Sequence, residues 1–184
     1  MDNYFYFLEL VGKRQSVRGY KNQEVEKEKI LRCIEAARLA PSACNSQPWK
    51  FIIVDKPDLK NQLAELTTTG ILPINHYTKQ APVHVVLVME KPNLTSKIGE
   101  VVRDKPFTFI DIGIATIQFC LQATVEGLGT CMLGWFNEKK VKKLLNIPVS
   151  KRAALVITLG YPSSDEIRVK QRKRIEDVYS MNSY

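Results

Sequence analysis

Two short segments near the start of the chain concentrate the residue types that could do chemistry. The first, Arg14-Gln-Ser-Val-Arg18, places two guanidinium groups and a hydroxyl at alternate positions. On extended backbone, alternate side chains share one face, so these three groups can converge on a single anion. Guanidinium groups and hydroxyls match the charge and the acceptor oxygens of a phosphate monoester. The segment therefore predicts a phosphate site; taken alone, a solvated loop is the alternative.

The second segment is Pro41-Ser-Ala-Cys-Asn-Ser-Gln-Pro-Trp49, a polar turn between two prolines that opens into an apolar run. Backbone groups of residues 41–43 can approach a ligand closely because their side chains are small. Asn45 offers a donor and an acceptor, which suits the imide-like edge of a flat polar ring. Gln47 can bind the same ring or only order the turn. The alternative is an ordinary helix–strand connection in which Asn45 satisfies its own turn.

Two further segments complete the candidate set. In Thr130-Cys-Met-Leu-Gly-Trp-Phe136, Gly134 would let the backbone approach a ligand, with its N–H near a ring nitrogen. The triplet Arg172-Lys-Arg174 can supply the remaining positive charge around a phosphate, although basic triplets are also common on solvated surfaces.

The bulk composition indicates one ordinary globular domain spanning residues 1–184. Hydrophobic residues make up 45% of the chain and charged residues 25%, and this length is enough for one good core. The net charge is +8. The basic residues are scattered, and no zinc finger, aromatic RNA-binding motif or helix-turn-helix punctuation accompanies them. We therefore expect an anionic cofactor and a basic surface, and no nucleic-acid partner.

Location and metal content are also constrained. No apolar run approaches the roughly 18 residues of a membrane span, and Met1-Asp-Asn-Tyr4 does not begin a signal peptide. We therefore expect a cytoplasmic protein with no membrane partner. The four cysteines lack CxxC spacing, which favours reduced and mostly buried thiols. Two histidines with no paired Cys/His spacing predict no protein metal site.

Periodicity places these segments on a plausible scaffold. Residues 3–12 and 25–39 show helical spacing, and shorter helices are expected after Pro57 and over 138–145. The expected strands cover residues 49–55, 84–89, 130–135 and 153–159. Residues 67–82 are expected to be irregular, and 91–107 to form a mobile flap.

Residues 109–126 form the most apolar helix candidate, ended by Gly127. Because one small domain offers few places to bury such a helix, it favours an obligate oligomer interface. Alternating helices and strands indicate an α+β or α/β sandwich around one sheet.

In their order and spacing, the four segments resemble the nitroreductase family of FMN-dependent oxidoreductases. The resemblance extends from Arg14 to Arg174 and includes Glu-Gly-Leu-Gly-Thr130, Leu-Gly-Trp-Phe136 and Leu-Gly-Tyr-Pro162. It implies an α+β, three-layer fold with a mostly antiparallel central sheet flanked by helices. It also implies an intertwined homodimer that holds two FMN molecules, each lined by both subunits.

The resemblance also assigns site residues. It places Arg14, Ser16, Arg172 and Arg174 at the FMN phosphate, and Arg18 at the phosphate or the pyrimidine edge. It implies that the ring and ribityl chain are lined by Pro41, Ser42, Ala43 and Asn45. Leu133 and Gly134 would contribute backbone near the reactive edge of the ring, and Gln15 belongs to the same cofactor-binding set. Asn75 and Lys79 match a further ring-contacting pair more loosely.

The implied activity is transfer of hydride from NADH or NADPH, through the flavin, to a nitroaromatic, quinone or related small-molecule electron acceptor by a ping-pong mechanism. No side chain is required as a nucleophile. One alternative is a specialised flavin reaction of the same fold, such as dehalogenation, flavin fragmentation or azoline oxidation. Another is a flavin-binding sensor or redox store without turnover. Cys44 departs from the small or hydroxyl residue usual in the family, and it places a thiol near the expected flavin.

Overall fold

The computed structural model describes residues 4–68 and 74–184. The α-helices are α1 (Tyr4–Lys13), α2 (Lys27–Arg38), α3 (Pro57–Thr67), α4 (Leu94–Arg103), α5 (Phe107–Val125) and α6 (Glu138–Leu144). The strands are β1 (Trp49–Val54), β2 (Val83–Met89), β3 (Gly129–Leu133) and β4 (Arg152–Gly160). Short 3-10 helices are η1 (Ala43–Asn45), η2 (His76–Gln80) and η3 (Ile175–Asp177).

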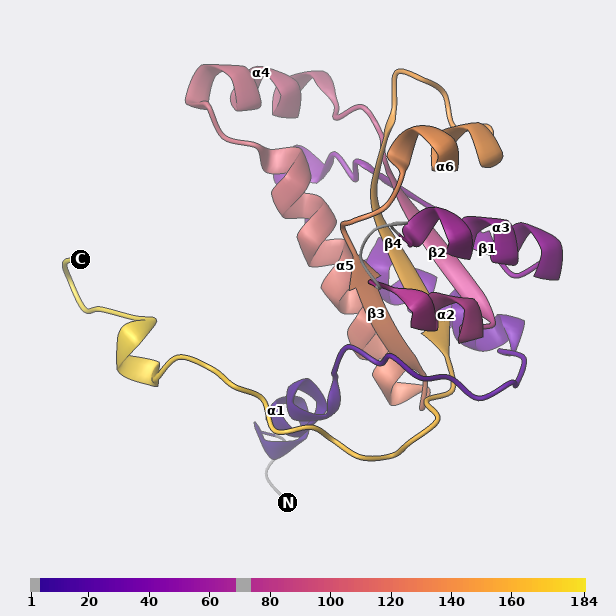
Figure 1. Cartoon of the computed structure of the whole chain (residues 1–184). Helices are drawn as coiled ribbons and strands as arrows, with labels where there is room; N and C mark the ends of the chain where they lie inside the picture. The colour runs from indigo at the N-terminus through magenta and orange to yellow at the C-terminus, as the bar shows by residue number, and fades with distance from the viewer. Residues whose placement is uncertain (1–3, 69–73) are drawn as a thin grey trace.

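The four strands form one antiparallel sheet in the order β1-β2-β4-β3 (Figure 1). Trp49 pairs with Met89 at one end of the β1–β2 ladder, and Gly129 pairs with Gly160 at one end of the β3–β4 ladder. The central strand β2 is buried along nearly its whole length. Its continuous apolar run therefore reflects cover on both faces, as the sequence predicts.

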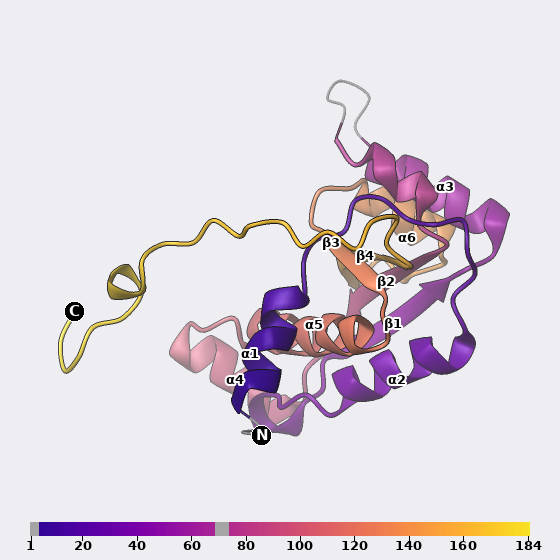
Figure 2. The ribbon, with the colours of Figure 1, turned by 90° about the horizontal axis from the view of Figure 1, so that it is seen from below.

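Helices cover both faces of this sheet (Figure 2). Helices α2 and α5 pack on one face, and α3 and α6 on the other. The first core combines residues of α2 and α5 with β2 and β4, and its larger members are Ile30, Val85, Phe119, Ile157 and Leu159. The second core joins α3 and α6 to the sheet through Leu63, Val86, Leu133, Val141 and Val156. The predicted α+β, three-layer fold is confirmed.

Most expected elements occur where residue periodicity places them. In α2, the buried residues Ile30, Cys33 and Ala37 recur on one face. Pro57 occupies the first turn of α3, where its missing N–H has no helical partner to lose. Gly127 takes a left-handed conformation with φ 74° after α5, as expected of a helix-ending glycine.

Three expectations need correction. Residues 91–107 are not an irregular flap, because they contain the ten-residue helix α4. This helix is stabilised by Asn93, whose side chain accepts the backbone N–H of Ser96 at its first turn. Residues 67–82 contain η2 and the end of α3, while 69–73 lie outside the described residues. The expected strand 130–135 ends at Leu133, so Gly134 and Trp135 follow the sheet edge.

Helix α5 is the longest described helix and lies between the sheet and the outer surface. By length and composition it could cross a membrane, with a mean hydropathy of 1.4. Its inner face is instead packed against the sheet and α2, with Ala115, Phe119 and Ala123 buried. Its outer face leaves Ile110 and Val125 more than half exposed. It is therefore a core helix with an uncovered apolar face.

Candidate cofactor site

The segment of residues 14–18 lies beside the start of β3. Ser16 forms an isolated parallel bridge with Thr130, and the backbone N–H of Val17 donates to the carbonyl of Thr130 at 2.9 Å. This pairing places Ser16 and Val17 along β3, whereas the backbone N–H of Arg14 still donates to the carbonyl of Leu10 at 2.9 Å, at the end of α1. It also brings the segment close to the Leu133–Gly134 end of the same strand.

A cavity of about 540 Å³ opens at that end. Its lining combines Arg18 with two segments that are distant in sequence, residues 74–77 and 131–135. The predicted residues Arg18, Leu133 and Gly134 are thus brought together, and Asn75 joins them. A Cβ atom built on Gly134 would meet no atom within 4 Å. The backbone of Gly134 therefore faces open space into which a flat ring could move.

A smaller cavity of about 220 Å³ continues from Arg18 along the same segment. Gln15, Ser16 and Arg18 line it, together with Arg168 from the C-terminal tail. Arg18 lines both cavities, so its side chain lies between the phosphate-type segment and the open backbone at Gly134. Gln15 also holds the tail, since its amide donates to the carbonyl of Glu166 at 2.7 Å and accepts from Arg168 at 3.2 Å.

Positive charge accumulates at the outer end of this region. Lys170 donates to the carbonyl of Val11 at 3.0 Å, which anchors the tail beside the first segment. Partial burial lowers the pKa of Lys170, and the positive charges of Arg14 and Arg172 lower it further. Within residues 4–68 and 74–184, no acidic side chain forms a salt bridge with any of these three cations. The cluster therefore fits a dianionic phosphate.

Arg174 lies apart from that arrangement, because its guanidinium pairs with Asp177 at 3.2 Å. Arg172 and Arg14 both lie near enough to Lys170 for their positive charges to lower its pKa. Of the two arginines predicted at the phosphate from the tail, the structure of one chain thus brings only Arg172 to the first segment.

Polar groups on the wall of the larger cavity are held by buried contacts. Tyr77 and Cys131 lie with their hydroxyl and thiol 3.1 Å apart. Burial raises the pKa of Tyr77, the Cys131 thiol raises it further, and the Arg18 guanidinium opposes the change. The Tyr77 hydroxyl therefore stays protonated and can donate. Asn75 donates to the carbonyls of Thr67 at 3.0 Å and of Trp135 at 3.4 Å, which joins the two lining segments.

The turn of residues 41–47 is built on the opposite end of α5. The backbone N–H of Ala43 donates to both carboxylate oxygens of Asp111, at 3.1 and 3.2 Å. That N–H is consequently committed to the protein, and the turn can approach a ligand only through its other groups. Asn45 accepts a hydrogen bond from the Gln47 amide at 3.0 Å. Gln47 therefore orders the turn and orients the Asn45 side chain.

The two halves of the predicted site do not meet within one chain. Asp111 holds the turn near the beginning of α5, whereas the charge of Arg14 reaches Cys120 and opposes the raised pKa of that buried thiol. These two positions are nine residues apart, or roughly 13 Å along a helix axis. Pro41, Ser42, Ala43 and Asn45 line neither the cavity at Gly134 nor the smaller cavity beside Arg18.

Several residues of this region were missed by sequence reasoning. Tyr77, Cys131 and Trp135 line the larger cavity, and Arg168 and Lys170 join the basic end. A signal for the last two was present, because Arg168, Lys170, Arg172 and Arg174 alternate along the tail and share one face of an extended chain. No comparable signal marks Tyr77, whose place depends on how residues 74–77 fold back onto β3.

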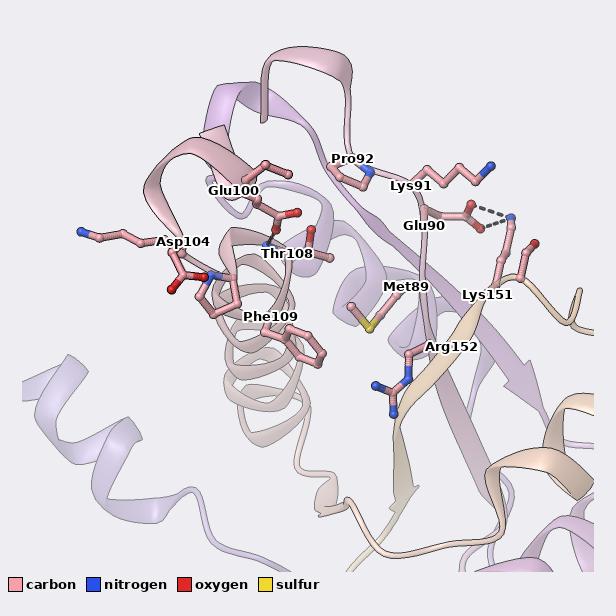
Figure 3. Close-up of a pocket in the computed structure, with 14 residues that line it drawn as sticks. Met89, Glu90, Lys91, Pro92, Glu100, Asp104, Thr108, Phe109, Lys151 and Arg152 are labelled. Atoms are coloured by element: carbon pink, nitrogen blue, oxygen red, sulfur yellow. Dashed lines mark hydrogen bonds and ion pairs between the residues drawn. The ribbon is translucent and has the colours of Figure 1, made fainter. Parts of the chain in front are cut away.

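Another cavity, of about 700 Å³, lies between α4, the start of α5 and the adjoining ends of β2 and β4 (Figure 3). Its charged walls are largely paired. Lys151 contacts Glu90 at 2.5 Å, and Glu100 accepts the backbone N–H of Thr108 at 2.6 Å. None of the predicted site residues lines it. Of these two contacts, that of Glu100 with Thr108 joins α4 to the start of α5.

The state of the four cysteines agrees with the expected free and mostly buried thiols. All four cysteines are free; Cys33, Cys120 and Cys131 are buried and Cys44 is exposed on the turn. Among the residues described, no group of three or more His, Cys, Asp or Glu side chains is arranged to hold a metal ion.

Comparison with known proteins agrees with this geometry. The model of the Nitroreductase family matches residues 11–161. A putative NADH dehydrogenase/NAD(P)H nitroreductase from Archaeoglobus fulgidus is 29% identical over 165 residues, covering 86% of this chain and 87% of that protein. An iodotyrosine deiodinase from Thermotoga neapolitana is 26% identical, covering 84% and 87% respectively. A solved FMN-dependent nitroreductase from Clostridium difficile R20291 superimposes with a TM-score of 0.79 at 26% identity, covering 96% of this chain and 99% of that one. The family match, the shared fold and the region around Arg18 and Gly134 together show that this chain belongs to the nitroreductase family of oxidoreductases.

Proposed function

We propose that this protein is an FMN-dependent oxidoreductase that transfers hydride from NADH or NADPH to a small conjugated acceptor, such as a nitroaromatic compound or a quinone, by a ping-pong mechanism. When bound, FMN supplies the hydride chemistry. The single observation that carries the proposal is that Arg18 lines both the smaller cavity beside residues 15–18 and the larger cavity at Gly134. Arg14, Lys170 and Arg172 add positive charge beside the same segment, and the backbone of Gly134 is open toward the larger cavity.

The chain's own residues would bind and orient the cofactor. Arg14, Ser16 and Arg172, with Lys170, would hold the phosphate. Arg18 would place a fixed positive charge beside Gly134, where negative charge on a reduced ring is stabilised. Leu133 and Gly134 would present backbone to the reactive edge. Trp135, which is 65% exposed, would limit access from solvent at the rim of the cavity.

A homodimer would complete the site. The turn of residues 41–45 does not line the cavity at Gly134, so a second copy would have to bring a turn to each cavity. The outer face of α5 suits such a contact, because Ile110, Ile117 and Val125 are exposed and Gly113 has open space beside it. A small residue on an apolar helix face lets a second helix approach closely. Crossing of two α5 helices would bury this face.

The C-terminal tail supports the same assembly. Beyond Lys170 it extends away from the domain (Figure 2). Its apolar residues, including Ile175, Val178 and Met181, are exposed in the single chain. Burying them on a second copy would remove that apolar surface from water. It would also give Arg174 a route to a phosphate that it does not reach within one chain. We further expect the protein to work in the cytoplasm, in keeping with its free thiols.

The test is a visible spectrum of the purified protein, recorded anaerobically before and after NADH and then NADPH. Flavin bands that bleach on addition, and return when a nitroaromatic or quinone is added, would support the proposed reaction and identify the preferred donor. A protein that cannot be loaded with FMN would refute it. Flavin bands that neither nucleotide bleaches would favour a sensor or storage role.

Reductive dehalogenation is the second candidate, and it is favoured by two observations. One is the likeness to the deiodinase from Thermotoga neapolitana. The other is that residues 91–107 contain the helix α4, with Ile98, Val101 and Val102 exposed, rather than an irregular flap. A helix with an apolar face could cover a halogenated phenol. Release of iodide from iodotyrosine by the reduced protein, and its absence with the oxidised protein, would establish this activity.

A further inference from the structure

Asn93 connects the turn of residues 42–47 to helix α4 through three hydrogen bonds. Its side-chain amide donates to the carbonyl of Cys44 at 2.8 Å, and its backbone N–H donates to the Ser46 hydroxyl at 2.8 Å. Its side-chain oxygen accepts the backbone N–H of Ser96 at 2.9 Å, which caps α4. One asparagine therefore uses both ends of its side chain to hold two elements that are far apart in sequence.

The turn needs such support because its backbone is unfavourable. Cys44, Asn45 and Gln47 all lie in the left-handed region, with φ of 51°, 51° and 47°. Residues other than glycine occupy that region at a cost, and a run of them persists only when the surroundings hold it. Asp111 holds the turn from α5, and Asn93 holds it from α4.

Helix α4 is itself held at its second half. The Glu100 carboxylate accepts the backbone N–H of Thr108 at the start of α5 (Figure 3). Between these two anchors, α4 exposes apolar side chains to solvent, and Val101 is 76% exposed. Asn93 is thus the junction between a strained turn and a helix that has little other contact with the domain (Figure 1).

We propose that Asn93 is a positioning residue for the cofactor: it pre-forms the turn that presents Asn45 to the flavin ring, and it couples that turn to α4. This inference rests on the proposed function. Ordering a loop during binding costs free energy, which lowers affinity. Asn93 orders the turn before FMN arrives, so it raises FMN affinity without touching FMN. By reciprocity, FMN bound against the turn stabilises the first turn of α4.

The test separates support of the turn from capping of the helix. Serine is as good an N-cap residue as asparagine, but its side chain is too short to reach the Cys44 carbonyl. Asn93→Ser therefore keeps the cap and removes the support. Asn137→Ser is the matched control, because Asn137 caps α6 in the same way, accepting the backbone N–H of Lys140 at 3.1 Å. Ser46→Ala is a second variant that leaves the Asn93 side chain in place.

FMN dissociation constants from flavin fluorescence and hydrogen exchange of the α4 amides are measured on each full-length apoprotein and its FMN-loaded form. We expect Asn93→Ser to weaken FMN binding about tenfold, the range of one lost hydrogen bond, and to abolish FMN-induced protection of α4. Ser46→Ala should weaken binding in the same direction, and Asn137→Ser should match the wild type.

Two outcomes would count against the proposal in different ways. If the wild type binds FMN and Asn93→Ser and Ser46→Ala both bind it equally well, the positioning role of Asn93 is overturned while the proposed function stands. If the wild-type protein takes up no FMN, the proposed function itself is overturned, and the positioning role with it. Equal weakening by Asn137→Ser would show a general effect of replacing an asparagine at a helix N-terminus and would also overturn the inference.

Discussion

The buried carboxylate of Asp111 receives the backbone N–H of Ala43 on both of its oxygen atoms, at 3.1 and 3.2 Å. Asp111 is only 4% exposed. Burial raises its pKa, and the Ala43 N–H opposes that change. A carboxylate kept in such a place has a structural task, which here is to fasten the turn of residues 41–47 to α5.

Replacement of Asp111 by alanine should therefore destabilise the protein. The Ala43 N–H would lose its acceptor, and a buried unpaired donor costs about 2 kcal/mol. Asp111→Asn keeps one acceptor oxygen in a side chain of the same shape and should recover most of the loss. Urea denaturation of the two apoproteins measures the difference. Equal stability of Asp111→Ala and wild type would mean that the turn is held without this contact.

Arg14→Ala should weaken binding of FMN and leave binding of riboflavin unchanged. The expected loss is at least tenfold, because a hydrogen bond to a charged group contributes roughly 1.5–3 kcal/mol. Riboflavin lacks the phosphate, so it isolates the ring contribution. The control is Arg38→Ala, since Arg38 pairs with Glu35 on the outside of α2. Fluorescence titration with both ligands gives the answer; an equal loss for riboflavin would contradict a phosphate role. Turnover at saturating FMN should be nearly retained.

Ile117→Asp should convert a dimer into monomers. Ile117 lies on the outer face of α5 and is 37% exposed in the single chain. A charge placed in an apolar interface is strongly unfavourable. Light scattering after gel filtration should show half the wild-type mass at micromolar protein concentration. FMN affinity should fall as well, because each site would lose the turn supplied by the second copy. Val149→Asp, at a side chain exposed in the loop before β4, should leave the mass unchanged. A dimer that survives Ile117→Asp would place the interface elsewhere.

His84 should make the protein sensitive to mild acid. It is fully buried on β2, and neither ring nitrogen has a hydrogen-bond partner among the described residues. Burial, together with the nearby charge of Lys60, lowers the pKa of His84 to about 4. In the unfolded chain His84 therefore binds a proton below about pH 6.5, whereas in the folded chain it does so only near pH 4. Between these values the unfolded state holds more protons, so stability falls as the pH falls.

The loss should approach about 3 kcal/mol at pH 4, because a gap of one pH unit between the folded and unfolded pKa values corresponds to roughly 1.4 kcal/mol. His84→Leu should remove that part of the acid dependence in denaturation curves measured from pH 7 to pH 4. His76, the exposed second histidine, supplies the control, and His76→Leu should retain the wild-type slope. Parallel slopes for wild type and His84→Leu would show that other groups cause the acid loss.

The positions of most helices and strands were accessible from sequence because they depend on local spacing. Ile30, Cys33 and Ala37 recur at helical intervals, and the unbroken apolar run of β2 signals a strand covered on both faces. Pro57 and Gly127 mark helix ends through their own backbone preferences. Helix α4 also carried a local signal, with Asn93 as N-cap and Ile98 and Val102 one turn apart, but the polar residues around them concealed it.

The features of the candidate site also divide into those that the sequence indicated and those that only the tertiary structure decided. Residue type alone indicated that Arg14, Ser16 and Arg18 suit a phosphate. Tertiary structure alone decided that Ala43 binds Asp111 and that Cys44 binds Asn93, across 68 and 49 residues. It also decided that the turn of residues 41–47 does not line the Gly134 cavity of the same chain. Such contacts depend on how whole elements pack, and local periodicity carries no information about which distant partner will lie opposite.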